Sequence, residues 1–297
     1  MKLHVVDGTW ELFRAHFSKR PRAEVDGRDV KATLGVLDSL LALIQDPAEH
    51  VTHIAVAFDN PIRSFRNDLF PGYKTDEGVP PELLGQFDLV EEATAALGVV
   101  VWRMGPYECD DALATAAVRY ASEVEEVRIC TPDKDLGQAV GDAGPGARVV
   151  QVDRLNGRVL DVEGVRQRLG VSPASVPDYF ALVGDDADGI PGLPGFGARS
   201  AAALLNRWGH LEQIPRERPE LWELRGAGRL AAVLRERWSD ALLYRTLATL
   251  VTDVPLAESL DDLRWRGPTP ALTPLLIGLR AQRLLQRALA APVQAGA

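Results

Sequence analysis

The sequence contains few cysteines and no long apolar segment. Its 297 residues include only two cysteines, Cys109 and Cys130, which are too few for a disulfide framework. No apolar run approaches the ~20 residues that a membrane helix requires, which excludes a membrane-spanning protein. The N-terminal segment MKLHVVDGTW has an apolar run that is too short for a signal peptide. We therefore expect a protein of the reducing cytoplasm.

Basic charge is also scarce. The chain has 33 lysines and arginines against 42 aspartates and glutamates, which gives a net charge of −9. Proteins that coat nucleic acid without sequence preference carry a basic field, so the charge argues against that class. Only five of the basic residues are lysines, which makes a lysine within a motif, such as Lys74, more informative than usual. The function must then depend on where the acids lie.

The first 130 residues alternate short β-branched runs with helical periodicity. Strands are predicted over 2–6, 52–58, 99–103 and 127–130, and helices over 30–44, 81–97 and 110–122. This alternation predicts an α/β fold with a central, mostly parallel sheet flanked by helices. Two further strands, 148–152 and 158–160, flank Asn156-Gly157, which predicts a two-residue hairpin turn.

The pattern changes after about residue 170, where strand signals stop. Helices are predicted over 176–183, 198–208, 230–250 and 274–291, with turns rich in glycine and proline between them. We therefore expect an α/β domain over 1–170 and a helical region over 171–297. The last six residues, PVQAGA, are expected to fray.

Acidic clusters follow the predicted strands or begin the helices next to them. In chain order they are Asp7, Asp59, Glu108 with Asp110 and Asp111, Asp133 with Asp135, and Asp185 with Asp188. Each cluster alone could consist of helix caps or turn residues. The carboxyl ends of parallel strands, however, meet at one edge of a sheet. So many like charges at one edge would destabilise the fold unless a cation neutralised them.

The composition of these clusters indicates which cation would bind. Carboxylate oxygens without histidine or cysteine partners select Mg²⁺ or Mn²⁺ over Zn²⁺, and the five histidines show no ligand spacing. A carboxylate site for hard divalent ions is typical of phosphoryl transfer, in which two metals stabilise the attacking and leaving oxygens.

A glycine-rich stretch over 190–201 is the second informative motif. Gly195 and Gly197 immediately precede a predicted helix, where backbone N–H groups and the helix dipole favour an anion. No P-loop follows, so ATP is not the expected ligand. The stretch is either a contact for the DNA backbone or a tight connector between two helices.

A basic segment with interleaved aromatic residues follows Asp59. Arg63, Phe65 and Arg66 are followed by Tyr73 and Lys74. Such a mixture can hold phosphates and stack an unpaired base, although a solvated loop would have a similar composition.

Together these motifs resemble the 5′-nuclease family, which includes the 5′→3′ exonuclease domain of bacterial DNA polymerase I, phage 5′ exonucleases and flap endonucleases. The similar segments run from Asp7 to about Leu256 and read VVDGTW, AFDNP, SFRNDLFPGYK, YECDDALA, TPDKDL and ALVGDDADGIPGLPGFGARSAAALL. The resemblance implies a PIN-like fold, a helical arch around 66–97 and a helix–three-turn–helix motif around 176–208. Because no polymerase domain follows, we expect a free-standing nuclease.

The resemblance also implies roles for individual residues. The first metal site would comprise Asp7, Asp59, Glu108, Asp110 and Asp111, and the remaining ligands, mostly for a second site, would be Asp133, Asp135, Asp185 and Asp188. Two Mg²⁺ ions are implied, with Mn²⁺ as a substitute, and a K⁺ ion at the glycine loop. Catalytic roles fall to Lys74, Arg66 and Tyr73 at the foot of the arch, and DNA contacts to Gly192, Gly195, Gly197, Arg199 and Ser200.

The chain differs from the family pattern at two places. Gly189 stands where relatives usually have asparagine, and the arch segment 75–81 is acidic where relatives often carry lysine or arginine. These differences bear on strand threading and affinity rather than on the chemistry.

The expected function is therefore Mg²⁺-dependent hydrolysis of DNA at a free 5′ end or flap. Two alternatives stay open: a non-catalytic protein of the same fold that binds DNA junctions, and a PIN-type ribonuclease. The complete acidic set argues against the first, and the glycine motif, which suits duplex DNA, argues against the second. DNA is the expected partner, with a DNA polymerase or sliding clamp as a candidate protein partner and no membrane.

Overall fold

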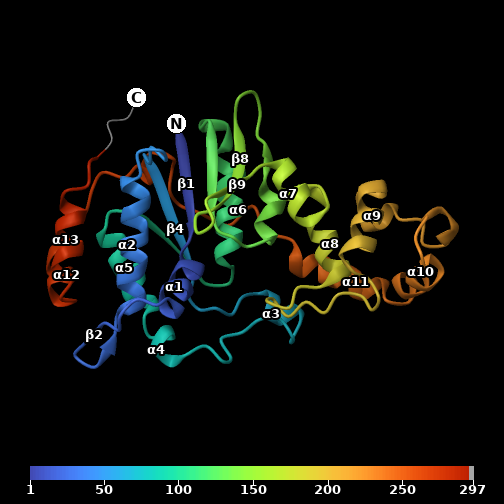
Figure 1. Cartoon of the computed structure of the whole chain (residues 1–297), viewed down its shortest axis with the longest axis horizontal. Coiled ribbons are helices and arrows are strands. Elements are labelled where there is room, and N and C mark those ends of the chain that lie inside the picture. The colour runs from blue at the N-terminus through green and yellow to red at the C-terminus, as the bar shows by residue number, and fades with distance from the viewer. Residues whose placement is uncertain (294–297) are drawn as a thin grey trace.

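Buried strands in the first half of the chain form one sheet, which the computed structural model describes together with the rest of residues 1–293 (Figure 1). Its strand order is β5-β4-β1-β6-β8-β7, and β9 pairs with β8. β5, β4, β1, β6 and β8 run parallel to their neighbours in that order, whereas β7 and β9 are antiparallel to β8. The strands are β1 (Lys2–Asp7), β4 (His53–Asp59), β5 (Val100–Met104), β6 (Glu126–Cys130), β7 (Gly141–Asp142), β8 (Arg148–Asp153) and β9 (Arg158–Leu160).

The parallel strands carry apolar side chains on both faces of the sheet, so helices pack against each face. One face packs Val6, Val56 and Phe58 against α1 (Gly8–Phe17), α2 (Lys31–Gln45) and α5 (Phe87–Ala96). The other face packs Val5 and Ala57 against α6 (Cys109–Tyr120). A small antiparallel pair, β2 (Glu24–Val25) and β3 (Arg28–Asp29), lies between α1 and α2 in sequence.

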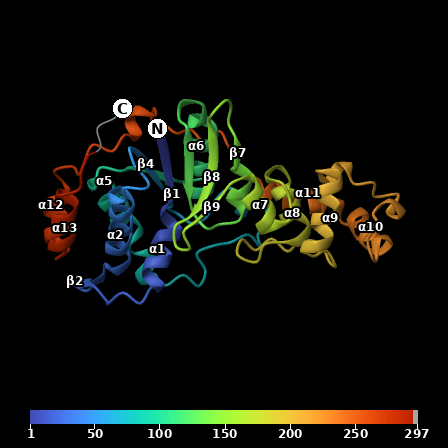
Figure 2. The same ribbon diagram turned by 45° about the horizontal axis from the view of Figure 1, so that its top comes forward.

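The helical region forms a second core at one end of the molecule (Figures 1 and 2). This core includes Leu182, Leu204 and Leu234, which are fully buried. Its helices are α7 (Val162–Leu169), α8 (Val176–Val183), α9 (Ala198–Trp208), α10 (Ala227–Glu236) and α11 (Trp238–Ala248). The short helices α3 (Arg66–Leu69) and α4 (Pro81–Leu84) belong to the segment that connects β4 to α5.

The chain returns to the sheet after α11. Leu250, Val254 and Leu263 pack in the core beside α6. The last helices, α12 (Leu272–Gly278) and α13 (Gln282–Leu289), then cover α2 and α5 at the end of the molecule opposite α9 (Figures 1 and 2). The predicted frayed segment 292–297 lies mostly outside the described residues; positions 292 and 293 belong to no helix or strand.

The predicted α/β class with a mostly parallel sheet and a helical C-terminal region is confirmed. Three predicted helices are wrong in one respect, since each is divided in two. The 81–97 helix breaks between α4 and α5, where the Gln86 side chain accepts hydrogen bonds from Thr33. The 230–250 helix breaks at Arg237, and the 274–291 helix breaks at Arg280, which has a left-handed φ of 53°. Apolar periodicity continues across such breaks and therefore does not reveal them.

Two helices were not anticipated from the sequence. α1 begins at Gly8, directly after Asp7, whose carboxylate accepts from Trp10 N at 2.8 Å as an N-cap, and α7 is capped in the same way by Asp161. The predicted two-residue hairpin turn is also wrong: β8 and β9 are joined by residues 154–157, since the Asp153 carboxylate accepts hydrogen bonds from Asn156. Within residues 1–293, no helix is both long and apolar enough to cross a bilayer.

Candidate metal centre and DNA-binding surfaces

The carboxyl edge of the sheet holds the first two predicted ligands. Asp7 ends β1 and Asp59 ends the neighbouring strand β4. The two oxygens of Asp7 accept hydrogen bonds from Trp10 N and from the Thr131 hydroxyl, each at 2.8 Å. The Asp59 carboxylate accepts from Cys109 N at 2.6 Å. These bonds fix the orientation of both side chains and tie β1, β4 and the start of α6 together.

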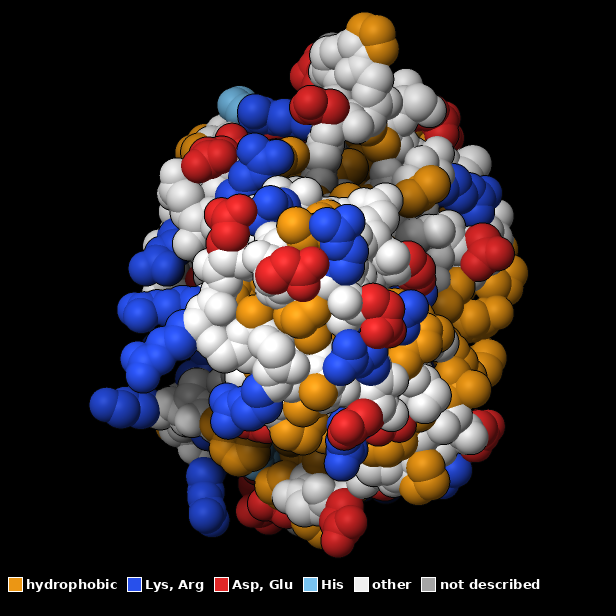
Figure 3. Space-filling model, turned by 90° about the vertical axis from the view of Figure 1, so that its right-hand side faces the viewer, with side chains coloured by type: hydrophobic (Ala, Val, Ile, Leu, Met, Phe, Trp, Pro, Cys, Tyr) orange, Lys and Arg blue, Asp and Glu red, His pale blue; other side chains and the backbone are white. Residues whose placement is uncertain are grey.

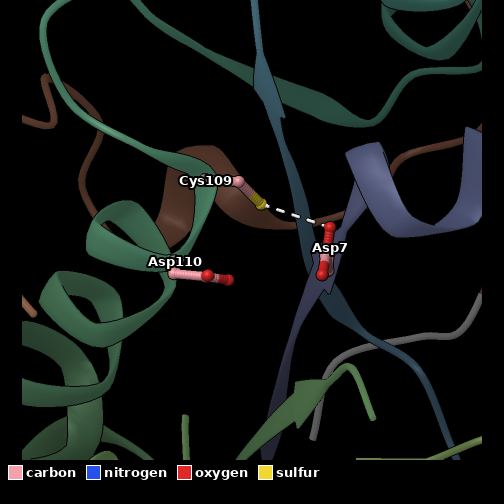
Figure 4. Close-up of side chains that lie close together, drawn as sticks. All are labelled: Asp7, Cys109 and Asp110. Atoms are coloured by element: carbon pink, nitrogen blue, oxygen red, sulfur yellow. Dashed lines mark hydrogen bonds between the residues drawn. The ribbon is translucent and has the colours of Figure 1, made fainter. Parts of the chain in front are cut away.

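The start of α6 brings Asp110 to the same edge (Figure 4). Ligand atoms of Asp7, Cys109 and Asp110 all lie within 4.8 Å of one another. The Cys109 thiol lies 3.5 Å from Asp7 Oδ1 and 3.3 Å from the Ala57 carbonyl. Burial raises the pKa of the Cys109 thiol well above its ordinary value, and the nearby Asp7 and Asp59 carboxylates raise it further. A neutral thiol is a poor ligand, so the donor set consists of carboxylates and suits a hard cation.

The segment after β6 contributes Asp133 and Asp135. The Thr131 hydroxyl accepts from Asp133 N at 3.2 Å while donating to Asp7, so this segment is linked directly to β1. Asp135 is 4% exposed, and its Oδ1 has no hydrogen-bond partner among the described residues. An orphaned, buried carboxylate oxygen is costly, and a bound cation would satisfy it.

The electrostatic surroundings of these acids oppose their ionisation. Burial raises the pKa of Asp7 to about 7, and Asp59 and Asp133 add to the effect. Burial likewise raises the pKa of Asp59 to about 6, with a contribution from Glu108. For Asp110 and Asp135, burial and neighbouring carboxylates raise the pKa well above its ordinary value. A divalent cation would restore the charged form of all four groups.

Most of the predicted ligands line one of two cavities. A cavity of about 310 Å³ is lined by Lys74 and by four acids, Asp7, Asp59, Asp110 and Asp133. A second cavity of about 430 Å³ is lined by Asp185 with Lys134 and Arg168. Besides burial, the charges of Asp133, Asp188 and Asp185, in decreasing order, raise the pKa of Asp135, which therefore lies close to both groups. The predicted ligands therefore form a principal cluster of four and a second group around Asp135, Asp185 and Asp188.

Among residues 1–293, Lys74 is the one basic side chain that lines the principal cavity. Its Nζ lies 2.8 Å from Glu108 Oε2 and 3.0 Å from Asp188 Oδ1, and its backbone N–H donates to the Asp188 carbonyl at 3.0 Å. Burial disfavours its charge, but Glu108 and Asp188 raise the pKa of Lys74 well above its ordinary value. The side chain is 23% exposed, so a permanently charged ammonium faces both the cavity and solvent.

Arg66 is buried, so in this arrangement its side chain cannot make the predicted contact with a phosphate. Its side chain is 1% exposed. All five of its N–H groups are engaged: Nη1 and Nη2 bind Asp111 and Glu108, and Nε and Nη2 donate to the carbonyls of Leu247 and Thr249. We therefore revise this prediction, because Arg66 is a buried tie between α3, α6 and the end of α11.

Asp111 and Glu108 are bound to basic side chains in this arrangement, and their role as metal ligands stays a prediction from the sequence. Both oxygens of Asp111 bind Arg66, and they also accept from Val251 N and Glu108 N. Glu108 accepts from Ser64, Arg66, Tyr73 and Lys74. Although burial opposes ionisation, Lys74 and Arg66 lower the pKa of Glu108 to about 2. In this arrangement the two acids hold Arg66 and Lys74 in place.

Tyr73 is not available to stack on a base. Its side chain is 4% exposed and belongs to the core of the helical region. The hydroxyl donates to Glu108 Oε2 at 3.2 Å, and the ring lies 5.7 Å from Lys74 Nζ. Tyr73 therefore contacts Glu108 and Lys74 from within the core, and its ring is not exposed for the predicted stacking role in this arrangement.

Part of the glycine loop between α8 and α9 packs closely against the protein's own backbone. Gly192 is buried with φ of 66°, and a Cβ there would lie 2.4 Å from Gly184 N, so it makes a close backbone contact and not a DNA contact. Gly195 is exposed, with φ of 85°, and Arg199 is exposed on the first turn of α9. The Gly197 N–H donates to Ser200 Oγ at 3.0 Å, which leaves both groups engaged in the helix cap.

Free donors nevertheless remain at the start of α9. Among residues 1–293, no acceptor lies within hydrogen-bond distance of the backbone N–H groups of Gly195, Ala198 and Arg199. Figure 3, which looks onto the end of the molecule that carries α9 and α10, shows Lys and Arg side chains gathered along one edge. The loop therefore retains the donors that an anion requires.

Three further residues at these sites were missed at the sequence level. Trp10 and Phe13, on α1, form an apolar wall of the principal cavity. Arg229, on α10, lies next to Gly195: a Cβ on Gly195 would be 3.5 Å from its Nη2. The spacing Asp7, Trp10, Phe13 fits one face of a helix and could have identified the wall, had α1 been recognised. No local signal links Arg229 to a loop some 30 residues away.

Comparisons with known proteins agree with this architecture. A family model described as 5′-3′ exonuclease, N-terminal resolvase-like domain, matches residues 2–170. A second model, described as 5′-3′ exonuclease, C-terminal SAM fold, matches residues 171–271. The fold is similar to that of the bacteriophage T5 D15 flap endonuclease in a complex with DNA and metal ions, with a TM-score of 0.61 and 16% identity over 97% of this chain and 99% of the other.

Curated relatives are of two kinds. The 5′-3′ exonuclease of Aquifex aeolicus is 30% identical over 267 residues, which cover 90% of this chain and 87% of the relative. The DNA polymerase I of Rhizobium leguminosarum is 33% identical over 268 residues, which cover 88% of this chain but 26% of the polymerase. The chain thus spans between about a quarter and a third of the length of its DNA polymerase I relatives. The two family models together match residues 2–271, which confirms the prediction from the motifs: the chain belongs to the 5′-3′ exonuclease family.

Proposed function

We propose that this protein is a metal-dependent nuclease that hydrolyses phosphodiester bonds of DNA at a free 5′ end or a 5′ flap. The observation that carries the proposal is the principal cavity. Four carboxylates from three strand ends and one helix start line it together with a charged lysine. Such a cavity suits a polyanion held through bound cations, and it would repel a polyanion without them.

The metals we propose are two Mg²⁺ ions, with Mn²⁺ as a substitute. Asp7, Asp59, Asp110 and Asp133 would hold the first, and Asp135, Asp185 and Asp188 would hold the second. Bound there, the ions would supply Lewis acidity for forming hydroxide and for neutralising the phosphate. The orphaned oxygen of Asp135 and the raised pKa values of Asp7 and Asp59 support this assignment.

The chain's own residues would position the substrate. Lys74 presents a compact charge that a scissile phosphate could approach, and Glu108 keeps this ammonium in place. Trp10 and Phe13 offer an apolar surface against which the base next to that phosphate could rest, so they take the stacking role first assigned to Tyr73. We further propose that the segment around 66–97 is the arch through which the 5′ strand passes.

The duplex part of the substrate would bind at the helical region. The free N–H groups at Gly195, Ala198 and Arg199, with Arg229 beside them, form a surface for backbone phosphates. The T5 relative of similar fold, whose structure contains DNA and metal ions, supports DNA as the partner. A K⁺ ion at this loop, a polymerase or clamp partner, the division at residue 170 and a cytoplasmic location remain predictions from the sequence.

The test is cleavage of a 5′-flap DNA labelled at both strand ends, compared with a matched RNA, with Mg²⁺ or with EDTA. We expect cleavage of the DNA in Mg²⁺ alone, and none by an Asp110→Asn/Asp133→Asn variant. Binding without cleavage would favour a junction-binding protein, and preferential cleavage of the RNA would favour a ribonuclease. Asp142→Asn, an exposed acid on β7, serves as the matched control and should cleave like the wild type.

A further inference from the structure

The main chain of Lys74 is held more firmly than its place in the chain requires. Lys74 belongs to the connection between α3 and α4, residues 70–80, which contains no helix or strand and is exposed over most of its length. In an exposed connection, water satisfies most backbone polar groups. The N–H and the carbonyl of Lys74 are instead both bound by groups outside the connection, namely by Asp188 and Asn67. Two such ties on one residue of a loop need an explanation.

Asn67, on α3, makes the first tie. Its side chain is 7% exposed. Its Nδ2 donates to the carbonyl oxygens of Lys74 at 2.8 Å and of Tyr73 at 3.3 Å. Its Oδ1 accepts from the N–H of Ser64 at 2.9 Å, which fixes the orientation of the amide. Because both ends of the amide are engaged, Asn67 links the start of α3 to the carbonyl of Lys74.

The loop over residues 185–190 makes the second tie. Asp185 and Ile190 close this loop by exchanging two backbone hydrogen bonds, each 2.8 Å long, and Ile190 is buried in the core of the helical region. Within the loop, the Asp188 carbonyl accepts from Lys74 N at 3.0 Å, and the Asp188 carboxylate lies 3.0 Å from Lys74 Nζ. The main chain and the ammonium of Lys74 are thus held by the same residue of an anchored loop.

Gly189 allows the loop and the connection to come this close. Its φ of 72° lies in the left-handed region, which disfavours a side chain. A Cβ on Gly189 would overlap the carbonyl oxygen of Gly72 and would lie 3.6 Å from Cα of Tyr73. Any side chain at this position would therefore push residues 72–74 away from the loop and weaken its tie to Lys74. The close contact at Gly189 is thus a condition of that tie.

We propose that Asn67 and Gly189 are positioning residues that hold Lys74 at the principal cavity before DNA binds. Both lie outside the lining of that cavity, so they would act on the substrate only through Lys74. A lysine has a long, flexible stem, and fixing its main chain reduces the volume that the ammonium can occupy. A charge that is already in place loses less freedom when the scissile phosphate arrives, which favours the reaction rate more than the substrate affinity. This inference rests on the proposed function, because it takes Lys74 to act on that phosphate.

The experiment compares two variants, each made in the wild type and in Lys74→Ala. Gly189→Ala adds the side chain that the close contact excludes. Asn67→Asp keeps the acceptor for Ser64 N but replaces the donor with an oxygen that repels the carbonyls now bound by the amide. Gly141→Ala, on β7, is the matched control, since among residues 1–293 no atom lies within 4 Å of an added Cβ. Single-turnover cleavage of a 5′-flap DNA in Mg²⁺ gives the rate, and binding in Ca²⁺ gives the affinity.

We expect Gly189→Ala and Asn67→Asp each to lower the rate about 10- to 30-fold, because a displaced ammonium stabilises the transition state less well. Affinity for the DNA should stay within about twofold of the wild type. In the Lys74→Ala background, each substitution should change the remaining rate by less than about twofold, since effects that act through one side chain are not additive. Gly141→Ala should match the wild type in rate and affinity. If Gly189→Ala fails to fold, Asn67→Asp makes the same comparison from the other side of Lys74.

Other outcomes overturn the inference. An equal loss of rate with and without Lys74 would mean that the substitutions act elsewhere, for instance on the proposed metal ligand Asp188. An unchanged rate for both variants would mean that Lys74 needs no support from its main chain, and a loss of affinity alone would make both residues part of substrate binding. If Lys74→Ala itself cleaved like the wild type, this inference would fail while the proposed function stood. A wild type that does not cleave the DNA would instead contradict the proposed function.

Discussion

The two edges of the sheet both carry carboxylates, but only at one edge do basic side chains neutralise them. At the amino edge, Glu126 bonds to Arg128 and Arg148, and Glu49 bonds to His4 and Arg128. The bond from His4 and the charge of Arg128 lower the pKa of Glu49 to about 2. At the carboxyl edge, burial among other acids raises the pKa of Asp7 to about 7 instead.

The difference separates a cluster that is balanced within the fold from the one that we propose binds metal. Acids that each have a basic partner stabilise the fold and need no further ligand. Acids that outnumber their basic partners store repulsion, which persists only where binding or catalysis uses it. The predictions below break or sharpen this contrast by altering one edge at a time.

The largest expected effect is on cleavage. Asp110→Asn should lower the single-turnover rate on 5′-flap DNA by about 10²- to 10³-fold, because one preorganised charge of the metal centre is lost. Glu126→Gln, the equivalent change at the amino edge, should leave the rate at saturating enzyme unchanged. Equal losses in both variants would mean that the two edges do not differ in function.

The second prediction concerns Lys74. Lys74→Ala should lower the single-turnover rate by about 10²-fold with little change in substrate affinity, because the ammonium would act mainly on the transition state. Lys74→Arg should restore affinity but not the rate, since a guanidinium is larger and planar. A rate for Lys74→Ala within about threefold of the wild type would remove Lys74 from the catalytic residues.

The third prediction is that neutral variants at the two edges shift stability in opposite directions. Without metal at pH 8, Asp110→Asn should raise the melting temperature because it removes repulsion. Glu126→Gln should destabilise the protein by about 2 kcal/mol, since it weakens charged hydrogen bonds to Arg128 and Arg148. Thermal unfolding in EDTA measures both, and a fall in both variants would contradict the idea of stored repulsion.

A fourth prediction uses pH and metal together. The pKa of Asp7 rises from 3.8 to about 7 on folding and that of Asp59 to about 6, so the native state binds more protons than the unfolded chain between about pH 4 and 7. Their contribution to stability is therefore present at low pH and is lost as the pH rises through this window.

Saturating Mn²⁺ should accordingly raise the melting temperature by roughly 5 to 10 °C at pH 8. The rise should be smaller at pH 5.5, where protons compete with the metal for the carboxylates. Asp110→Asn/Asp133→Asn should abolish most of the rise at pH 8, and an undiminished rise in that variant would mean that Mn²⁺ binds elsewhere.

The smallest expected effect is at the glycine loop. Gly195→Ala should weaken duplex binding about 3- to 10-fold, because the left-handed backbone at 85° disfavours a side chain and the loop must shift. Gly197→Ala is the matched control: its φ of −142° suits any residue, and no atom lies within 4 Å of an added Cβ. Equal affinity of the two variants for duplex DNA would make the loop a connector only.

The sequence predicted the parallel strands and the principal acids because both depend on local order. Asp7 and Asp59 end their strands and Asp133 closely follows β6, and parallel strands end at one edge, so the proximity of these acids follows from the fold class. Burial and partners could not be predicted in the same way. Arg66 is as basic as Lys74 in the sequence, yet its five donors are satisfied by groups up to 183 residues away.

The helical boundaries were less predictable for a related reason. The break at Arg280 depends on a left-handed residue that is not glycine, which no periodicity reveals. The start of α1 was missed because Asp7 looked like a turn residue, although it is an N-cap and also lines the cavity. The sequence pattern around Asp7 indicated its place at the end of a strand but not its second role as a helix N-cap.

The tie at Arg66 has a consequence for how the centre is assembled. Its guanidinium joins Asp111 to the carbonyls of Leu247 and Thr249, so the position of Lys74 eight residues later depends on the end of α11. Closing a loop of some 180 residues is slow compared with forming the local strands and helices. A chain that ends near residue 170 would hold the acids of β1, β4 and β6 but would lack Asp188, which binds Lys74, and the two carbonyls that bind Arg66. We therefore expect the proposed metal centre to be complete only once the C-terminal half has folded, together with the helices that we propose bind DNA.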